Sequence, residues 1–186
     1  MARVIRAVGP CRLPQRHGRY ATLVHAIISQ QVSTASARAV QKKLRRVAGG
    51  YLSPERIAAL SLKELASAGL SRAKAGYIAG LAAAVSSRQL RLDNIHRLDD
   101  QAVIECLIAI KGIGPWTAHM FLMFVLNRPD IMPTGDLGIA YGFRRVYGLG
   151  KVPSEKRMLA LSEPWRPYRT VGSWYLWRSL DLPSDS

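Results

Sequence analysis

The chain has 186 residues, enough for one domain or for two small lobes that fold as one unit. Lysine and arginine total 27 against 12 aspartates and glutamates, and the resulting formal net charge of +15 predicts a polyanionic partner, most simply nucleic acid. No apolar run is long enough to span a membrane, no signal-peptide pattern is present, and two cysteines are too few for a four-cysteine iron–sulfur or zinc site.

The N-terminal segment predicts a lead-in followed by two helices. Residues 1–18 carry glycine and proline among arginines and are poorly specified, apart from a partial helix over 3–8. Apolar residues at helical spacing predict a helix over 20–31. Ser33 is suited to cap the next helix, over 34–47, whose outer face is strongly basic. A generic solvated basic surface is the alternative interpretation. Charge by itself indicates affinity for nucleic acid but does not indicate recognition of a particular base sequence.

Four further helices are predicted between residue 47 and Gly112. Ser53 and Pro54 start a short helix, and the second helix begins with a capping box formed by Ser61 and Glu64. Ser71 caps an alanine-rich helix over 72–87. A loop over 93–99 separates it from a helix over 100–109, which Asp99 or Asp100 opens.

The tripeptide 112–114, Gly-Ile-Gly, follows the helix over 100–109 and is typical of a tight hairpin, because glycine lets another backbone approach closely. Pro115 suits the first position of a helix over 115–126. The bare amides at that helix N-terminus, opened by glycines, make a seat for a phosphate. An ordinary interhelical turn is the alternative, but one turn needs only one such glycine.

The C-terminal third predicts three helices. Asp136 lies in the loop Pro-Thr-Gly-Asp-Leu-Gly, where it can cap a helix over 137–147, present a carboxylate to a site, or do both. Ser154 opens a helix over 155–162, and a last helix covers 168–180. No stretch shows sustained period-two alternation, so we expect an all-α protein of about ten helices in two lobes.

The hairpin and the aspartate together resemble the signature of the helix-hairpin-helix DNA glycosylase superfamily. The matching residues are Leu107, Ile110, Gly112, Ile113, Gly114, Thr117, Ala118 and Asp136. The resemblance covers about residues 20–180, with the hairpin at 107–118. It implies a single glycosylase unit over 1–186, built of two helical lobes with the active site in the cleft between them.

Three features select the branch of 3-methyladenine DNA glycosylase II. Residues 26–33 are similar to that branch's A-I-x-x-Q-Q-x-S helix end, and residues 165–169 with Trp177 are similar to its W-[RK]-P-[WY]-R…W ending. Trp116 stands where bifunctional glycosylase–lyases carry a catalytic lysine. The chain departs from larger members in having no room for their extra N-terminal β-rich lobe and only one carboxylate at Asp136.

The resemblance assigns roles to particular residues. Asp136 would be catalytic, and a base pocket would be lined by Trp116, Trp177, Met120 and Leu137, the last two where larger members can carry aromatics. The implied DNA-binding residues are the wedge Gln31, at the end of its helix, with Lys111, Gly112, Ile113, Gly114 and Thr117. Main-chain carbonyls of Ile108, Ile110 and Ile113 would hold a structural Na⁺ or K⁺.

Several residues are expected to serve the fold instead. A tryptophan at helical spacing usually packs in a core, which we expect of Trp174, and Trp165 should pack within a lobe. Gln30 should hydrogen-bond within the fold. The two cysteines indicate a reducing compartment, with Cys106 inside an apolar helix.

The implied function is a monofunctional glycosylase that flips and excises alkylated purines of the 3-methyladenine and 7-methylguanine type from double-stranded DNA, with no lyase activity. It would be a cytoplasmic monomer, associated with the nucleoid if bacterial, with no membrane partner, no required cofactor and no iron–sulfur cluster. Two alternatives remain, a non-catalytic helix-hairpin-helix DNA-binding module and a glycosylase of the same fold for another base.

Overall fold

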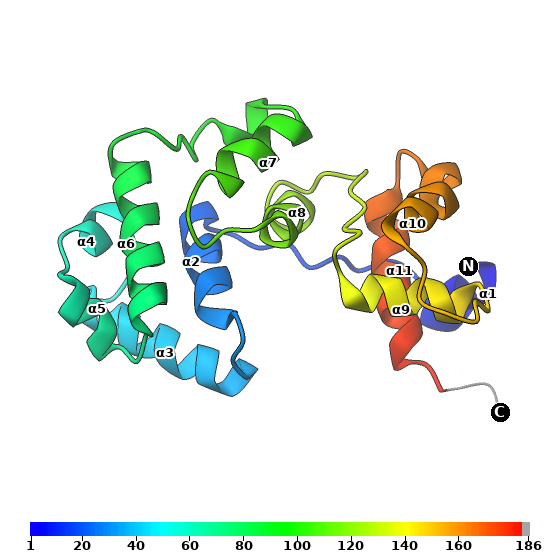
Figure 1. The fold of residues 1–186 in the computed structure, drawn as a ribbon, viewed down its shortest axis with the longest axis horizontal. Coiled ribbons are helices and arrows are strands. Elements are labelled where there is room, and N and C mark those ends of the chain that lie inside the picture. Colours follow the sequence, from blue (N-terminus) through cyan, green and yellow to red (C-terminus); the bar gives the residue numbers. More distant parts are fainter. Residues whose placement is uncertain (184–186) are drawn as a thin grey trace. The chain divides into compact units, whose positions relative to one another are not determined.

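Helices joined by turns and irregular loops make up residues 1–183, the part of the chain that the computed structural model describes (Figure 1). No strand occurs in that part, which confirms the expected all-α class. The chain divides into two compact units. We call Arg16–Phe121 the hairpin unit, and Met1–Gln15 together with the chain from Leu122 onward the carboxylate unit.

The hairpin unit holds most of the short helices. They are α2 (Arg19–Ser29), α3 (Thr34–Val47), α4 (Pro54–Ala58), α5 (Leu62–Ser67), α6 (Arg72–Ser86), the 3₁₀ turn η1 (Ile95–Arg97), α7 (Asp100–Ile108) and the start of α8 (Pro115–Phe124). Five predicted starts are confirmed by a side-chain cap that accepts a backbone N–H three residues on: Ser33, Ser53, Ser61, Ser71 and Asp99. Each such cap contributes about 1 kcal/mol to helix stability.

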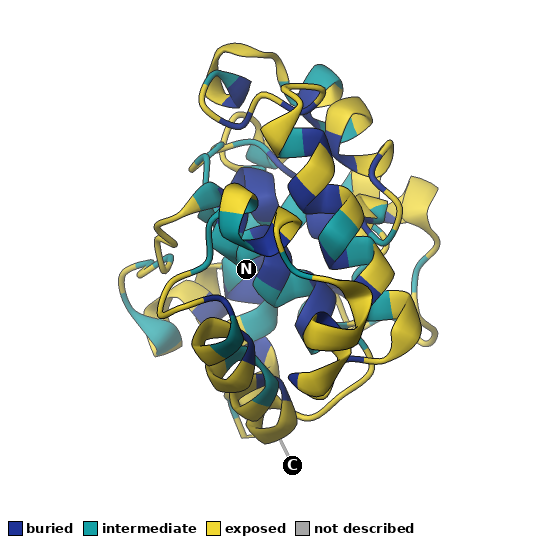
Figure 2. Ribbon diagram, turned by 90° about the vertical axis from the view of Figure 1, so that its left-hand side faces the viewer, coloured by how far each residue is buried: buried dark blue, intermediate teal, exposed yellow. Residues whose placement is uncertain are grey.

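The core of the hairpin unit forms between α2, α4, α5 and α6. Leu23, Val24, Ile27 and Ile28 of α2 are almost fully buried, together with Ile78 and Leu81 of α6. Figure 2 shows buried residues on inner helix faces and exposed residues on outer ones. Apolar residues recur at helical spacing, so each helix buries one face against its neighbours and leaves the opposite face exposed.

The carboxylate unit is built on α9 (Leu137–Val146) and α11 (Arg169–Asp181), with α1 (Ala2–Val8), α10 (Glu155–Ser162) and the 3₁₀ turn η2 (Glu163–Trp165) around them. A Cβ added at Gly142 would lie 2.8 Å from the Leu176 carbonyl oxygen, so this glycine allows α9 and α11 to pack closely. Trp165 stacks on Phe143 with ring centroids 5.3 Å apart, as expected of a packing residue.

An ion-pair network fixes the start of α11 in the carboxylate unit. Asp130 accepts hydrogen bonds from Arg169 Nε at 2.6 Å and Nη2 at 2.9 Å, and from Arg166 Nη1 at 2.8 Å. Burial opposes ionisation of Asp130, but the hydrogen bonds and charges of both arginines outweigh it and hold the pKa of this carboxyl below its usual value. The network ties the segment before Asp136 to the helix that carries Trp177.

Three expectations need correction. The helix predicted to end at Gln31 ends at Ser29, and Gln31 lies beyond it with a left-handed φ of 55°, which closes the turn into α3. Cys106 lies in α7 but is exposed, because it falls on the outer face of that helix. The predicted loop after residue 93 contains η1.

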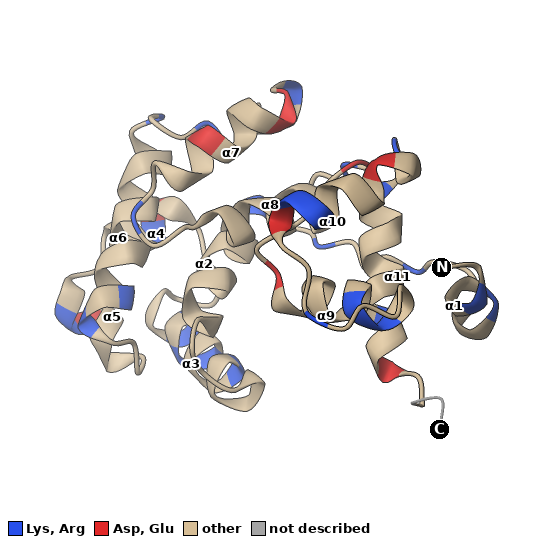
Figure 3. Cartoon of the chain, turned by 45° about the vertical axis from the view of Figure 1, so that its right-hand side comes forward, with Lys and Arg blue, Asp and Glu red and all other residues tan. Residues whose placement is uncertain are grey.

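Basic residues lie on helices of both units, with a run along α3 (Figure 3). Among the helices of residues 1–183, none combines the length and the apolar character that crossing a bilayer requires.

Candidate functional site

The hairpin is a tight turn between α7 and α8. The Ile113 N–H donates to the Ile110 carbonyl at 3.0 Å, and the Ala118 N–H donates to the Gly114 carbonyl at 3.1 Å. Gly112 has a φ of 95°, a conformation that side-chain-bearing residues rarely adopt. The first turn of α8 follows at once, so the positive end of its helix dipole lies at the hairpin. This geometry suits an anionic group.

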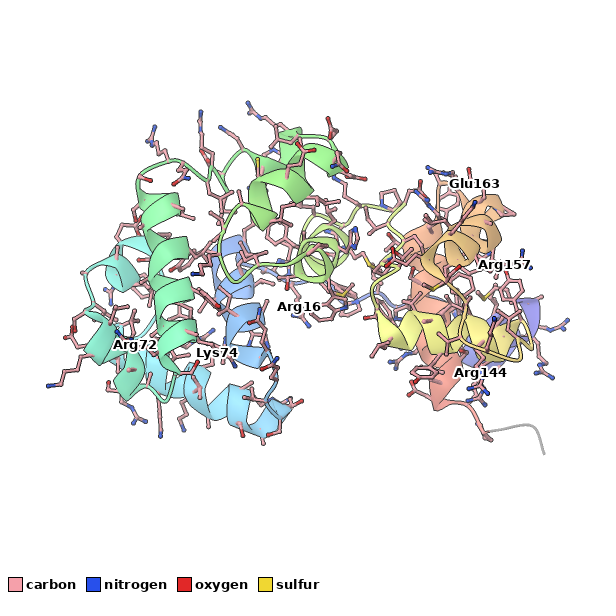
Figure 4. The ribbon with its side chains drawn as sticks, viewed as in Figure 1. Arg16, Arg72, Lys74, Arg144, Arg157 and Glu163 are labelled. Atoms are coloured by element: carbon pink, nitrogen blue, oxygen red, sulfur yellow. The ribbon has the colours of Figure 1, made fainter. Side chains whose placement is uncertain are left out.

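Two neighbouring elements hold the hairpin in place. Gln30 donates through Nε2 to the Gly112 carbonyl at 2.8 Å, which confirms its expected role within the fold. Lys74 of α6 donates in turn to the carbonyls of Ile28 and Gln30, at 2.8 and 2.5 Å (Figure 4). Burial lowers the pKa of the Lys74 ammonium, because removal from water disfavours its charged form.

The ring of Tyr77 lies directly against the hairpin. A Cβ added at Gly112 would lie 2.5 Å from Cδ2 and Cγ of that ring, closer than real side chains pack. A Cβ added at Gly114 would meet nothing within 4 Å. The two glycines therefore differ: Gly112 is required by the fold, while Gly114 keeps the outer side of the hairpin open.

The other predicted residues of the hairpin unit are not equally accessible. Lys111 is exposed, and Trp116 is 48 % exposed and so presents much of its indole to solvent. Met120 is half-buried. Ile113 and Thr117, predicted to bind DNA, are 4 % and 6 % exposed, so any contact there would have to use the main chain. Gln31, the predicted wedge, is exposed.

In the carboxylate unit, two donors hold one oxygen of Asp136. The Ile139 N–H donates to Asp136 Oδ1 at 2.8 Å, so the predicted helix cap is confirmed. The indole N–H of Trp177 donates to the same oxygen at 3.0 Å. A Cβ added at Gly138 would lie 3.0 Å from that oxygen and from Trp177 Cδ1, so a glycine is needed here for both groups to meet. The carboxylate is half-buried and held in one orientation.

The hydrogen bond from Trp177 is the feature that sequence reasoning missed. The resemblance places Trp177 in a pocket wall. In the structure its half-buried ring stacks on Phe124 with ring centroids 6.0 Å apart. Asp136 and Trp177 are 41 residues apart and nothing in their local sequences couples them. Leu137, beside the carboxylate, is 73 % exposed, and Trp174 is half-buried with its ring edge-on to Tyr175.

The predicted cation site involves main-chain oxygens of the hairpin. The Ile110 carbonyl already accepts the turn hydrogen bond from Ile113, which leaves one lone pair for an ion. Binding by Ile108, Ile110 and Ile113 therefore stays a prediction. Within residues 1–183, no cluster of three histidine, cysteine, aspartate or glutamate side chains could hold a metal ion.

Comparisons with known proteins point in one direction. The family model of the HhH-GPD superfamily base excision DNA repair proteins matches residues 24–167. DNA-3-methyladenine glycosylase 1 of Schizosaccharomyces pombe is 34 % identical over 97 % of this chain and 82 % of its own length. The putative DNA-3-methyladenine glycosylase YfjP of Bacillus subtilis is 32 % identical over 87 % of this chain and 59 % of its own.

Solved structures agree with the sequence relatives. The crystal structure of DNA-3-methyladenine glycosidase from Bacillus halodurans has a TM-score of 0.88 and 36 % identity, covering 96 % of this chain and 82 % of that one. The Schizosaccharomyces pombe 3-methyladenine DNA glycosylase Mag1, in complex with abasic DNA, has a TM-score of 0.84 and 33 % identity, covering 100 % and 93 %.

Proposed function

Because the chain belongs to the HhH-GPD superfamily of base excision DNA repair proteins, we propose that it is a monofunctional DNA glycosylase that excises alkylated purines from duplex DNA. The substrates are bases of the 3-methyladenine and 7-methylguanine type. The observation that carries the proposal is the carboxylate of Asp136, which a helix amide and the Trp177 indole hold in one orientation.

The chemistry needs only one carboxylate. The C1′–N bond of the damaged nucleoside breaks, and its electron pair neutralises the formal positive charge of the alkylated purine, so no general acid is required to protonate the leaving base. The sugar passes through an oxocarbenium-like state, and a water oxygen then forms the new bond to C1′. Asp136 stabilises the sugar cation, accepts the proton of the attacking water, or does both.

The damaged base must leave the stack before this carboxylate can act on its sugar. The exposed Gln31 fills the gap in the duplex, and the hairpin amides with Lys111 hold a backbone phosphate. The exposed indole of Trp116 attracts the cationic purine through its π face, with Met120 as a further wall residue.

The absence of strand cleavage follows from the residue at position 116. A lyase needs an amine that forms a Schiff base with the sugar, and Trp116 supplies none. Lys111 is exposed on the hairpin, where it meets a phosphate.

The test is to incubate the protein with methylated duplex DNA and to separate the released bases by chromatography. We expect release of methylpurines, with no nicked strand and no covalent DNA adduct after borohydride reduction. Salt-sensitive DNA binding without base release would instead favour a binding module or a glycosylase for another base. A trapped adduct would contradict the monofunctional assignment.

Replacing Trp177 by phenylalanine separates its two roles. The substitution keeps an aromatic ring against Phe124 but removes the indole N–H that holds Asp136. A hydrogen bond to a charged group contributes about 1.5–3 kcal/mol, so we expect kcat of base release to fall about tenfold, which corresponds to about 1.4 kcal/mol in the barrier. KM should change little.

Steady-state kinetics on a duplex with one defined lesion gives this result. An unchanged kcat with a raised KM would mean that Trp177 serves as a pocket wall and not to position the carboxylate. Trp174→Phe, on the same helix, is the control and should leave both constants unchanged.

A further inference from the structure

One face of α3 forms what we call the basic stripe, made of Arg38, Lys42, Arg45 and Arg46. All four side chains are exposed. With 3.6 residues per turn, their positions fall within an arc of about 100° around the helix axis. The opposite face packs into the hairpin unit through Ala37 and Leu44, which are 1 % and 0 % exposed. Figure 3 shows the resulting run of basic residues along α3.

The charge of the stripe is not neutralised locally. α3 contains no acidic residue, and no aspartate or glutamate precedes Glu55 in the chain. In the described residues 1–183, none of the four stripe side chains forms an ion pair with a carboxylate. Arg45 and Arg46 lie in the last turn, where the helix dipole favours cations, but Arg38 lies too close to the N-terminus to benefit. Helix stability therefore does not account for the stripe.

A groove of about 330 Å³ borders the stripe between α2 and α3. Its lining includes Arg45 of the stripe, Arg16, His25 and Gln41. Burial lowers the pKa of the His25 imidazole, and the positive charges of Arg16 and Arg38 lower it further. The positive potential of the stripe thus extends into the groove.

We propose that the basic stripe, with Arg16 at its edge, is a second DNA-binding surface that holds backbone phosphates of undamaged duplex. The proposal rests on the proposed function, since it takes DNA as the substrate, but it involves neither the hairpin nor Asp136. Charge complementarity identifies the occupant. From Arg38 to Arg46 the helix rises about 12 Å, and one strand of a duplex presents a phosphate about every 3.4 Å along its axis. The stripe therefore spans three to four phosphates.

Such a surface acts before the glycosidic bond is broken, while the protein searches the DNA for a lesion. Contacts with phosphates carry no sequence information, so the stripe binds any duplex and allows the protein to slide or hop along undamaged DNA. The contacts should affect encounter and search but leave base release unchanged once a lesion is bound.

The experiment compares two full-length variants with equal loss of charge. The stripe variant carries Arg38→Gln, Lys42→Gln, Arg45→Gln and Arg46→Gln. The control variant replaces four exposed cations elsewhere: Lys63→Gln, Arg88→Gln, Arg97→Gln and Lys151→Gln. Glutamine has nearly the helix propensity of lysine and arginine, so both variants should melt near the wild-type temperature.

The first readout is the affinity for a short undamaged duplex, measured by fluorescence anisotropy at salt concentrations from about 50 to 200 mM. Each lost phosphate contact reduces the slope of log affinity against log salt by about 0.9, so the stripe variant should lose about 3 units of slope. The control variant should lose less than one unit. Equal losses in both variants would overturn the proposal, as would tighter stripe-dependent binding of duplex RNA than of DNA.

The second readout is excision itself. With enzyme saturating over a short lesion duplex, the stripe variant should release base at the wild-type rate, while on long DNA with two lesions it should act on both in one encounter less often. A lower rate at saturation would place the stripe in the catalytic machinery and overturn its assignment as a second surface. If the wild type releases no base, the proposed function fails, and the salt slopes still decide whether the stripe binds DNA.

Discussion

Asp136→Asn should slow base release strongly while leaving the fold and DNA affinity nearly unchanged. Asparagine keeps an oxygen that can accept from both the Ile139 N–H and the Trp177 indole, and it is as good a helix cap as aspartate. What it removes is the negative charge beside the sugar cation. Loss of one electrostatic stabiliser of this kind costs about a hundredfold to a thousandfold in rate. Single-turnover release of methylpurine from duplex DNA measures the change.

Asp136→Ala is the matched comparison, because it removes the charge and the cap together. It should lose a similar amount of activity and, in addition, about 1 kcal/mol of stability, which thermal unfolding detects. Turnover retained by Asp136→Asn would remove the carboxylate from the mechanism and leave Asp136 as a structural cap alone.

Gly112→Ala should destabilise the protein and weaken DNA binding together. A side chain at a φ of 95° costs about 1–3 kcal/mol. The new Cβ would also press on the ring of Tyr77, whose atoms lie 2.5 Å from its position, and overpacking typically adds about 1–3 kcal/mol. We expect a total of about 2–6 kcal/mol in chemical denaturation. Displacement of the hairpin should also lower affinity for duplex DNA.

Gly114→Ala separates structure from function at the same hairpin. Its Cβ would meet no protein atom within 4 Å and its φ is not positive, so stability should change little. The methyl group would nevertheless occupy the open side of the hairpin, where we place a phosphate, and DNA affinity should fall. A stable Gly114→Ala protein with unchanged affinity would argue against a phosphate at that position.

The local elements of this protein follow from its sequence alone. Ser33, Ser61, Ser71 and Asp136 were predicted to open helices, and each accepts a backbone N–H from the residue three positions on. Such a cap depends on one side chain and the next turn of backbone, so it can be recognised without knowing the rest of the fold. The hairpin can also be recognised from the sequence, because its glycines and Pro115 act on the local backbone.

The end of α2 shows where local reasoning stops. Its apolar spacing continues to Gln31, yet the helix ends at Ser29, since the carbonyls of Ile28 and Gln30 accept from Lys74 of another helix. Periodicity reports which face of a helix is apolar, but the last turn of a helix depends on which partners compete for its carbonyls.

The arrangement of the candidate site was decided by tertiary structure. Tyr77 lies against Gly112, and the Trp177 indole holds Asp136, through contacts between segments far apart in the chain. The sequence by itself identified the hairpin glycines, Asp136 and Trp177 as candidate site residues, because each belongs to a short motif. Only the packing of α9 against α11 brought the indole to the carboxylate, since a long-range contact depends on all the helices between its two residues.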